Sequence, residues 1–277
     1  MASHGKKITL YLIDGESSGR IMCDLSNWSG KAYKIPRSMV IKSSDRADLA
    51  NTGVYILFGK NELGDNMAYI GEAEHIYDRL KQHVASKDFW QEAIAFISKD
   101  NNLNKAHAKY LECRLYELAK SANRYVLDNS SKPTKSTISE PDIAEMEEFI
   151  ENLMLLTGTM GHKIFTPRVN LDKSAVNILT IERKGLHAKG MQTEDGFMVL
   201  SGSTISPQLK TVSKSVEALR QKYVDEGVIY QTDNEARLTK DVLFTSPSLA
   251  AVMVLGVSAN GLKEWKQNGI SLKDLGI

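Results

Sequence analysis

Between residues 55 and 112, five polar side chains are of types that handle protons or anions. They are two phenols, a guanidinium, an imidazole and a carboxylate: Tyr55, Tyr69, Arg79, His83 and Glu112. A guanidinium can donate a fork of hydrogen bonds to phosphate oxygens, and a carboxylate is a hard oxygen ligand for a divalent cation. Singly, each residue type is more often structural than catalytic. The chemistry therefore depends on the elements that would bring these side chains together.

Two β-forming runs carry the tyrosines. Residues 53–58 (GVYILF) and 67–71 (MAYIG) flank a turn-rich loop that contains Gly59, Gly64 and Asp65. Two such runs around a loop of this kind predict a hairpin with a longer connection.

A helix is predicted directly after the second run. Ile76, Leu80 and Val84 recur at intervals of four, as the buried residues of a helix do. Arg79 and His83 are also four residues apart, so they lie on one side of that helix. One helical face thus combines a cation and an imidazole with apolar neighbours.

A second helix is predicted from about Asn104 to Ala122. Its buried stripe consists of apolar residues at helical spacing: Ala108, Leu111, Leu115, Leu118 and Ala122. Glu112 lies beside this stripe, because Ala108 and Leu115 are its neighbours by helical spacing. The carboxylate should therefore point from the edge of the apolar face toward whatever the helix packs against.

The order of these residues resembles the core of the GIY-YIG nuclease family. The matching residues are Gly53-Val54-Tyr55, Tyr69-Ile70-Gly71, Arg79, His83 and Glu112. Val54 stands where the family usually has Ile, and the loop between the two motifs is slightly long. The final Asn of the family pattern is matched by Asn129, which follows the run YVLD, or by Asn123.

The resemblance implies a metal-dependent endonuclease that hydrolyses DNA phosphodiester bonds, in a repair, restriction or mobile-element setting. Glu112 would hold Mg²⁺ or Mn²⁺, and Arg79 would contact the phosphate. Tyr69 would take the proton from the attacking water, His83 would relay or accept it, and Tyr55 would position the water. A phenol with an unperturbed pKa of about 10 is a poor base at neutral pH, so this role needs a nearby positive charge.

The C-terminal third carries a second resemblance. Residues 196–203, 216–227 and 244–266 are similar to a small C-terminal domain of unknown function found behind bacterial GIY-YIG nucleases. Short strands, a helix at Ser215 to Glu226 and a helix opened by Ser246-Pro247 predict a small α+β module with its own core. By analogy, the parts that flank the nuclease core would choose the DNA target.

The chain is thus expected to be α+β, with a small antiparallel sheet flanked by helices and a separate small α+β C-terminal domain. Hairpin residues Asp14-Gly15 mark the N-terminal part, and Ser139 with Asp142 resembles a capping box that opens an acidic helix. The expected parts are an N-terminal β-rich segment (1–50), a GIY-YIG-like domain (51–135), the acidic amphipathic helix with a linker (136–170) and the C-terminal domain (171–277).

Residues 27–37 (NWSGKAYKIPR) interleave basic and aromatic side chains. Such a segment can follow a phosphate backbone and stack on bases. The alternative is a surface loop that Trp28 anchors to the core, since Trp is mostly buried.

Composition limits the function classes. The 277 residues are 42% hydrophobic and 25% charged, which describes about two globular domains, and no apolar run of eighteen residues indicates a membrane span. The start resembles no secretory signal, so a cytoplasmic protein is expected. Cys23 and Cys113 are too few for a disulfide framework and are expected in the core.

Net charge gives no strong indication of a partner. It is +1, but residues 136–157 hold six acidic and no basic side chains, so the remainder is mildly basic. DNA is the expected partner, with no membrane association. A catalytically inactive nucleic-acid-binding module and a protein-interaction scaffold on the same fold remain the alternatives.

Overall fold

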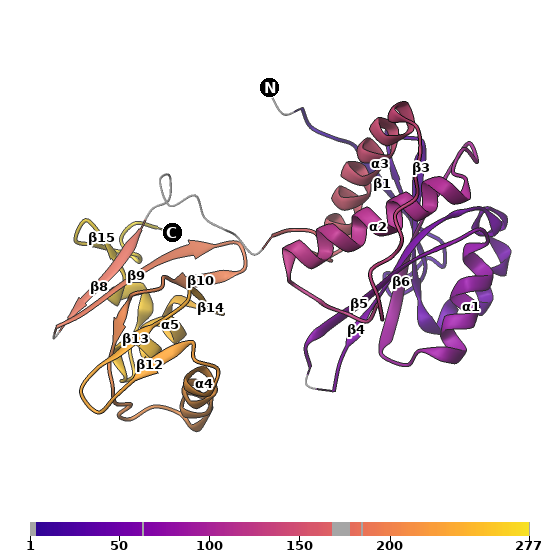
Figure 1. The fold of residues 1–277 in the computed structure, drawn as a ribbon. Coiled ribbons are helices and arrows are strands. Elements are labelled where there is room, and N and C mark those ends of the chain that lie inside the picture. Colours follow the sequence, from indigo (N-terminus) through magenta and orange to yellow (C-terminus); the bar gives the residue numbers. More distant parts are fainter. Residues whose placement is uncertain (1–3, 63, 168–177, 184, 277) are drawn as a thin grey trace. The chain divides into compact units, whose positions relative to one another are not determined.

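The computed structural model describes residues 4–62, 64–167, 178–183 and 185–276. The fold is mixed α+β, as expected, and the chain divides into two compact units, Met1–Asn170 and Leu171–Ile277 (Figure 1). The linker expected to end at residue 170 lies partly outside the described residues, and the start expected for the C-terminal domain, residue 171, lies outside them. Each unit is described by itself.

The first unit is built on one seven-stranded sheet in the order β1-β2-β3-β6-β4-β5-β7. Its strands are β1 (Ile8–Leu12), β2 (Ile21–Leu25), β3 (Gly30–Pro36), β4 (Gly53–Lys60), β5 (Asn66–Ala73), β6 (Trp90–Ser98) and β7 (Val126–Leu127). All neighbours pair antiparallel except β5 and β7, which are parallel. With seven strands and one parallel pair, the sheet is larger than the small antiparallel sheet that the sequence predicts.

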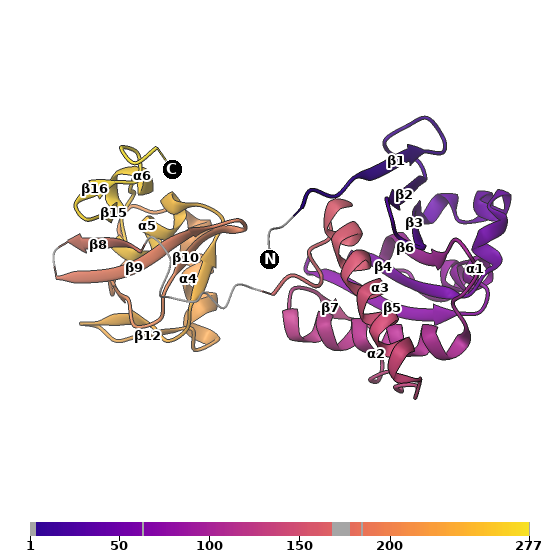
Figure 2. The same ribbon diagram turned by 90° about the horizontal axis from the view of Figure 1, so that it is seen from above.

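Helices cover both faces of this sheet (Figure 2). They are α1 (Ile76–Ser86), α2 (Lys105–Ala122), α3 (Glu140–Thr159) and the short 3₁₀ helices η1 (Arg37–Met39), η2 (Ile41–Asp45) and η3 (Ala47–Ala50). Alternate residues of a strand face opposite sides, so Val54 and Ile56 join the core beneath α2 and α3, whereas Tyr55 and Leu57 join the core beneath α1. No helix in the described ranges is long and apolar enough to cross a membrane.

The N-terminal segment is not a separate part, because β1 to β3 continue the same sheet. Residues 27–37 are also neither a loop nor a basic surface, since most of them form β3 between β2 and β6. Their cations are already engaged: Lys31 pairs with Asp48, Lys34 pairs with Glu92, and Arg37 donates to the carbonyls of Val84 and Trp90. Trp28 is buried, as expected.

Strand β6 is an element that the sequence patterns above do not predict. It pairs with β3 on one side and β4 on the other, and its residues 93–98 are all buried. A strand covered on both faces loses the alternation of polar and apolar residues that marks a half-exposed strand.

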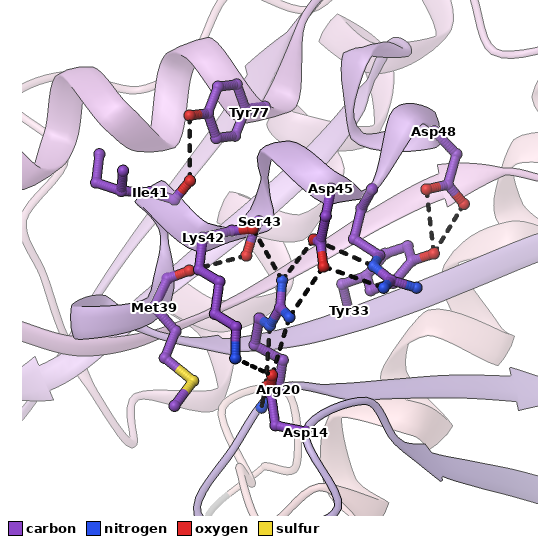
Figure 3. A network of polar contacts seen from close by, with 11 residues as sticks. Asp14, Arg20, Tyr33, Met39, Ile41, Lys42, Ser43, Asp45, Asp48 and Tyr77 are labelled. Atoms are coloured by element: carbon purple, nitrogen blue, oxygen red, sulfur yellow. Dashed lines mark hydrogen bonds and ion pairs between the residues drawn. The ribbon is translucent and has the colours of Figure 1, made fainter.

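The β1–β2 hairpin is fastened to the 3₁₀ segment by Arg20, whose side chain is 2% exposed. Its guanidinium donates to both oxygens of Asp14, to both oxygens of Asp45 and to the carbonyl of Lys42 (Figure 3). Lys42 also pairs with Asp14. The network joins the hairpin loop to η2, which is about twenty-five residues further along the chain.

The acidic helix and the cysteines take their expected places. The side chain of Ser139 caps α3 by accepting a hydrogen bond from the backbone of Asp142. Cys23 and Cys113 are buried free thiols. Since α3 packs into the same core as α2, it belongs to the first unit rather than to a linker.

The second unit contains two sheets around its own apolar core. One sheet has the order β14-β10-β9-β8-β15-β16 and the other β11-β13-β12. The elements are β8 (Leu179–Arg183), β9 (Leu186–Thr193), β10 (Gly196–Val199), β11 (Thr204–Ile205), α4 (Lys214–Asp225), β12 (Ile229–Gln231), β13 (Ala236–Leu238), β14 (Val242–Phe244), α5 (Pro247–Leu255), α6 (Gly261–Glu264), β15 (Lys266–Gln267) and β16 (Ile270–Ser271). Both predicted helices of this part are present.

Candidate functional site

The register of β4 and β5 sets the two tyrosines on one face of the sheet. Tyr55 pairs with Gly71 and Leu57 pairs with Tyr69, which leaves the phenol rings diagonal to each other, with centroids 6.2 Å apart. A Cβ atom on Gly71 would lie only 2.3 Å from the hydroxyl oxygen of Tyr55. Glycine at position 71 therefore leaves the space that the Tyr55 ring occupies.

His83 of α1 packs against both phenols. Its ring centroid lies 5.4 Å from that of Tyr55 and 5.2 Å from that of Tyr69. Its Nε2 atom is 2.7 Å from the Tyr55 hydroxyl, while its buried Nδ1 atom has no hydrogen-bond partner among the described residues. Burial lowers the pKa of His83 to about 4, and the positive charges of Lys87 and Arg79 act in the same direction. The imidazole is therefore neutral at pH 7.

Exposure separates the two tyrosines. Tyr55 is 1% exposed, whereas Tyr69 is half-buried. Burial raises the pKa of the Tyr55 phenol far above its usual value, so the phenol stays protonated. Because Tyr55 has almost no contact with solvent, its geometry differs from the expected one, in which this residue positions the attacking water. Tyr69 is the phenol that solvent can reach.

Arg79 lies on the exposed side of α1. Its guanidinium donates to the side chain of Gln82 at 3.2 Å. Together with Glu72 and Lys105 it lines a cavity of about 370 Å³ between β5 and α1. Positive charge on Arg79 lowers the pKa of both Tyr55 and Glu112, although no hydrogen bond or ion pair joins it to either group in the described structure.

Glu112 lies half-buried on α2, whose N-terminus is capped by the side chain of Asn104. Burial and the charge of Glu72 raise the pKa of Glu112, whereas Lys109, Arg79 and a hydrogen bond from the Glu72 backbone lower it, and the result is a pKa of about 7. Two carboxylates that repel each other in a partly desolvated place suit a divalent cation. The described residues offer no group of three metal-ligating side chains, so such a cation would keep water and substrate oxygens as most of its ligands.

Asn129, not Asn123, lies beside the tyrosine strand. Its side chain donates to the carbonyl of Ile70 at 2.8 Å and accepts from the Ile70 amide at 3.1 Å. Asn123 instead ends α2 in the left-handed conformation and lines another cavity with Lys120. Both the nitrogen and the oxygen of the Asn129 side chain bond to the backbone of Ile70, which is the geometry of a residue that holds Tyr69-Ile70-Gly71 in place.

Two further residues complete the cluster, and the sequence reasoning above does not single them out. The Lys87 ammonium lies 4.4 Å from the centre of the Tyr69 ring and forms an ion pair of 2.5 Å with Asp128. The backbone of Asp128 donates to the carbonyl of Ala68, which ties this carboxylate to β5. Lys87 follows the last turn of the predicted helix, and Asp128 ends the run YVLD. The two residues are 41 positions apart, so no local sequence pattern predicts that they form an ion pair.

The site residues thus fall into two groups. Tyr55, Tyr69 and His83 form one contiguous aromatic cluster on the α1 face of the sheet. The charges of Arg79 and Glu112 both act on the pKa of Tyr55, but within the described ranges no hydrogen bond or ion pair joins either residue to the phenols.

Comparisons with known proteins inform on the second unit only. Residues 179–276 match the family model described as Domain of unknown function (DUF4357). This match confirms the expected C-terminal domain of unknown function. The family models give no GIY-YIG match. No curated protein and no solved structure matches this chain.

Proposed function

We propose that the chain is a metal-dependent endonuclease that hydrolyses DNA phosphodiester bonds. The observation that carries the proposal is the cluster of Tyr69, Tyr55 and a neutral His83, with Arg79 and Glu112 within electrostatic range. Phosphodiester hydrolysis needs a group that takes a proton from water, a cation for the phosphate and charge stabilisation in the transition state. The cluster offers one candidate for each requirement.

The contacts support a proton path with roles that differ from those implied by the family pattern. Tyr69, the accessible phenol, would take the proton from the attacking water. Its ring centroid lies 6.2 Å from that of Tyr55, and the Tyr55 hydroxyl lies 2.7 Å from Nε2 of His83. In the tautomer with Nε2 unprotonated, His83 accepts the Tyr55 proton. Tyr55 would therefore relay a proton between Tyr69 and His83.

Positive charge beside Tyr69 makes this role feasible. A phenol becomes a base near neutral pH only where cations stabilise its anion. Lys87 lies over the Tyr69 ring, and Asp128 holds it there. Lys87 would stabilise the developing phenolate, which leaves Arg79 free to donate to the phosphate oxygens.

Glu112 would hold a divalent cation, with Glu72 adding negative charge nearby. When bound, Mg²⁺ or Mn²⁺ supplies positive charge for the phosphate and the departing oxygen. The pKa of about 7 means that Glu112 is about half protonated at neutral pH, so cation binding would displace its proton. DNA as the substrate follows from the family resemblance, and the flanking parts of the chain would choose the target.

Plasmid cleavage with Mg²⁺ tests the proposal. Glu112→Gln and Arg79→Ala should each lose about a hundredfold or more of the nicking rate, because each removes a charge that acts on the reacting phosphate. Glu117→Gln is the matched control, since Glu117 is another half-exposed carboxylate of α2 and pairs with Arg114 and Lys132. EDTA should abolish cleavage by the wild type.

Three outcomes separate the alternatives. Equal nicking by all variants would identify a contaminating nuclease and contradict the proposal. Salt-sensitive DNA binding without cleavage would favour the inactive nucleic-acid-binding module. Neither binding nor cleavage would favour the protein-interaction scaffold.

A further inference from the structure

Strand β1 forms an exposed apolar edge of the seven-stranded sheet (Figure 2). Among the described residues it pairs only with β2. Its last three residues are all large and exposed: Leu10 by 51%, Tyr11 by 55% and Leu12 by 41%. Proteins usually protect such edges with charges, proline or a covering element, and a bare apolar edge strand is a site for pairing with another strand.

The free hydrogen-bonding groups of this edge can be assigned. The carbonyl of Lys7 accepts from the backbone N–H of Ser26, and the N–H of Ile13 donates to the carbonyl of Arg20. Odd-numbered residues of β1 therefore direct their backbone N–H and carbonyl groups toward β2. Because these groups alternate along a strand, Ile8, Leu10 and Leu12 direct theirs outward. The Arg20 network fixes the hairpin that carries this edge.

We propose that β1 pairs antiparallel with β1 of a second copy of this chain, about a two-fold axis at Leu10. In that register Leu10 lies opposite Leu10 of the partner subunit, and Ile8 lies opposite Leu12 of the partner subunit. The outward residues of both strands thus form hydrogen-bonded pairs, and every cross-strand pair among them is apolar. This inference does not depend on the proposed nuclease activity.

Charge supports a second copy as the occupant. Exposed Lys6 and Lys7 precede the strand and the exposed Glu16 follows it, whereas Asp14 is already paired with Arg20 and Lys42. Antiparallel self-pairing therefore brings these lysines toward Glu16 of the partner subunit, and parallel pairing would set the lysines of both strands together. One short strand contributes little area, so a dimer that dissociates on dilution is expected.

Sedimentation of the full-length chain over a range of concentrations tests the dimer. The wild type should approach twice 30.8 kDa at high concentration. Leu10→Lys should remain monomeric, because it sets two cations opposite each other at the axis. Ile41→Lys is the control with the same charge change, since Ile41 is 56% exposed and lies on η2 rather than on β1. It should dimerise like the wild type.

A cross-linking measurement locates the contact. Leu10→Cys should be joined to its symmetry mate by a short bifunctional thiol reagent, because paired residues at the axis are about 5.5 Å apart between Cα atoms. Ile41→Cys should not be joined, and the native Cys23 and Cys113 are buried. A monomeric wild type at every concentration, or equal cross-linking of both variants, would overturn the proposal. So would a dimer that Leu10→Lys leaves intact.

Discussion

At the scale of single residues, burial decides which protonation state each group of the site adopts. Burial lowers the pKa of His83 and raises the pKa of Glu112. Both shifts favour the neutral form of the group, since desolvation penalises charge of either sign. The result at neutral pH is an unprotonated imidazole, whose nitrogen can accept a hydrogen bond, and a carboxyl group that is about half protonated. Both conditions agree with the proposed proton path and cation site.

The pKa of His83 predicts a pH-dependent stability. The folded value of about 4 lies below the unfolded value of 6.5, so between these two values the unfolded state binds more protons and stability falls as the pH is lowered. The loss amounts to roughly 3 kcal/mol from pH 7 to pH 4. Denaturant unfolding in EDTA should show a flatter pH dependence for His83→Gln than for the wild type.

For Glu112 the dependence of stability on pH has the opposite sign, so this residue serves as a comparison for His83. Its folded pKa of about 7 lies above the unfolded 4.5, so its contribution is fully present below pH 4.5 and is lost as the pH rises through 7. Glu112→Gln should therefore be more stable than the wild type at pH 8 without metal. Parallel pH profiles for wild type and His83→Gln would contradict the assigned burial of the imidazole.

Lys87 predicts a rate effect. Lys87→Met should lower cleavage by about tenfold or more, because the cation over the Tyr69 ring is removed. Lys81→Met is the control, as Lys81 is exposed on α1 and should cleave like the wild type. Equal cleavage rates for Lys87→Met and Lys81→Met would refute the electrostatic role of Lys87.

At the scale of elements, pairing between distant segments positions the site. The β4–β5 hairpin presents both phenols, α1 returns over them with His83, and Asp128 beside β7 brings Lys87 toward Tyr69. The same principle fastens the N-terminal hairpin through Arg20. A two-stranded hairpin is at best marginally stable by itself, so such contacts fix its position.

Arg20→Met tests that fastening. It removes a buried guanidinium that bonds to both Asp14 and Asp45, which should lower the free energy of unfolding. Arg46→Met is the control, because Arg46 is 33% exposed and pairs only with Asp45 among the described ion pairs, so its loss should cost about 1 kcal/mol or less. Equal effects of the two substitutions in denaturant unfolding would show that the network does not hold the hairpin.

At the scale of the whole molecule, two units with separate cores predict separable folding. Residues 178–277 have their own apolar core and coincide with the matched family domain. Expressed alone, this fragment should show a cooperative thermal transition and dispersed NMR resonances. Residues 1–170 should keep the cleavage activity proposed above, with altered target preference. A fragment 178–277 that stays unfolded would contradict the independence of the second core.

The sequence alone determined the elements whose residues contact their neighbours along the chain. The 53–71 hairpin, the helices that carry His83 and Glu112, the cap at Ser139 and the α+β C-terminal domain all follow from periodicity and turn residues. These signals are local, because spacing of 2 or 3.6 residues reports only which face a residue occupies.

Only the tertiary structure decided the rest. It placed the fully buried β6 between β3 and β4, made residues 27–37 an inner strand, and brought Lys87 to Tyr69 through Asp128. It also set His83 against Tyr55, and it gave the carboxyl group of Glu112 a pKa near 7. Strand partners and desolvation depend on residues far apart in the chain, so no local spacing records them.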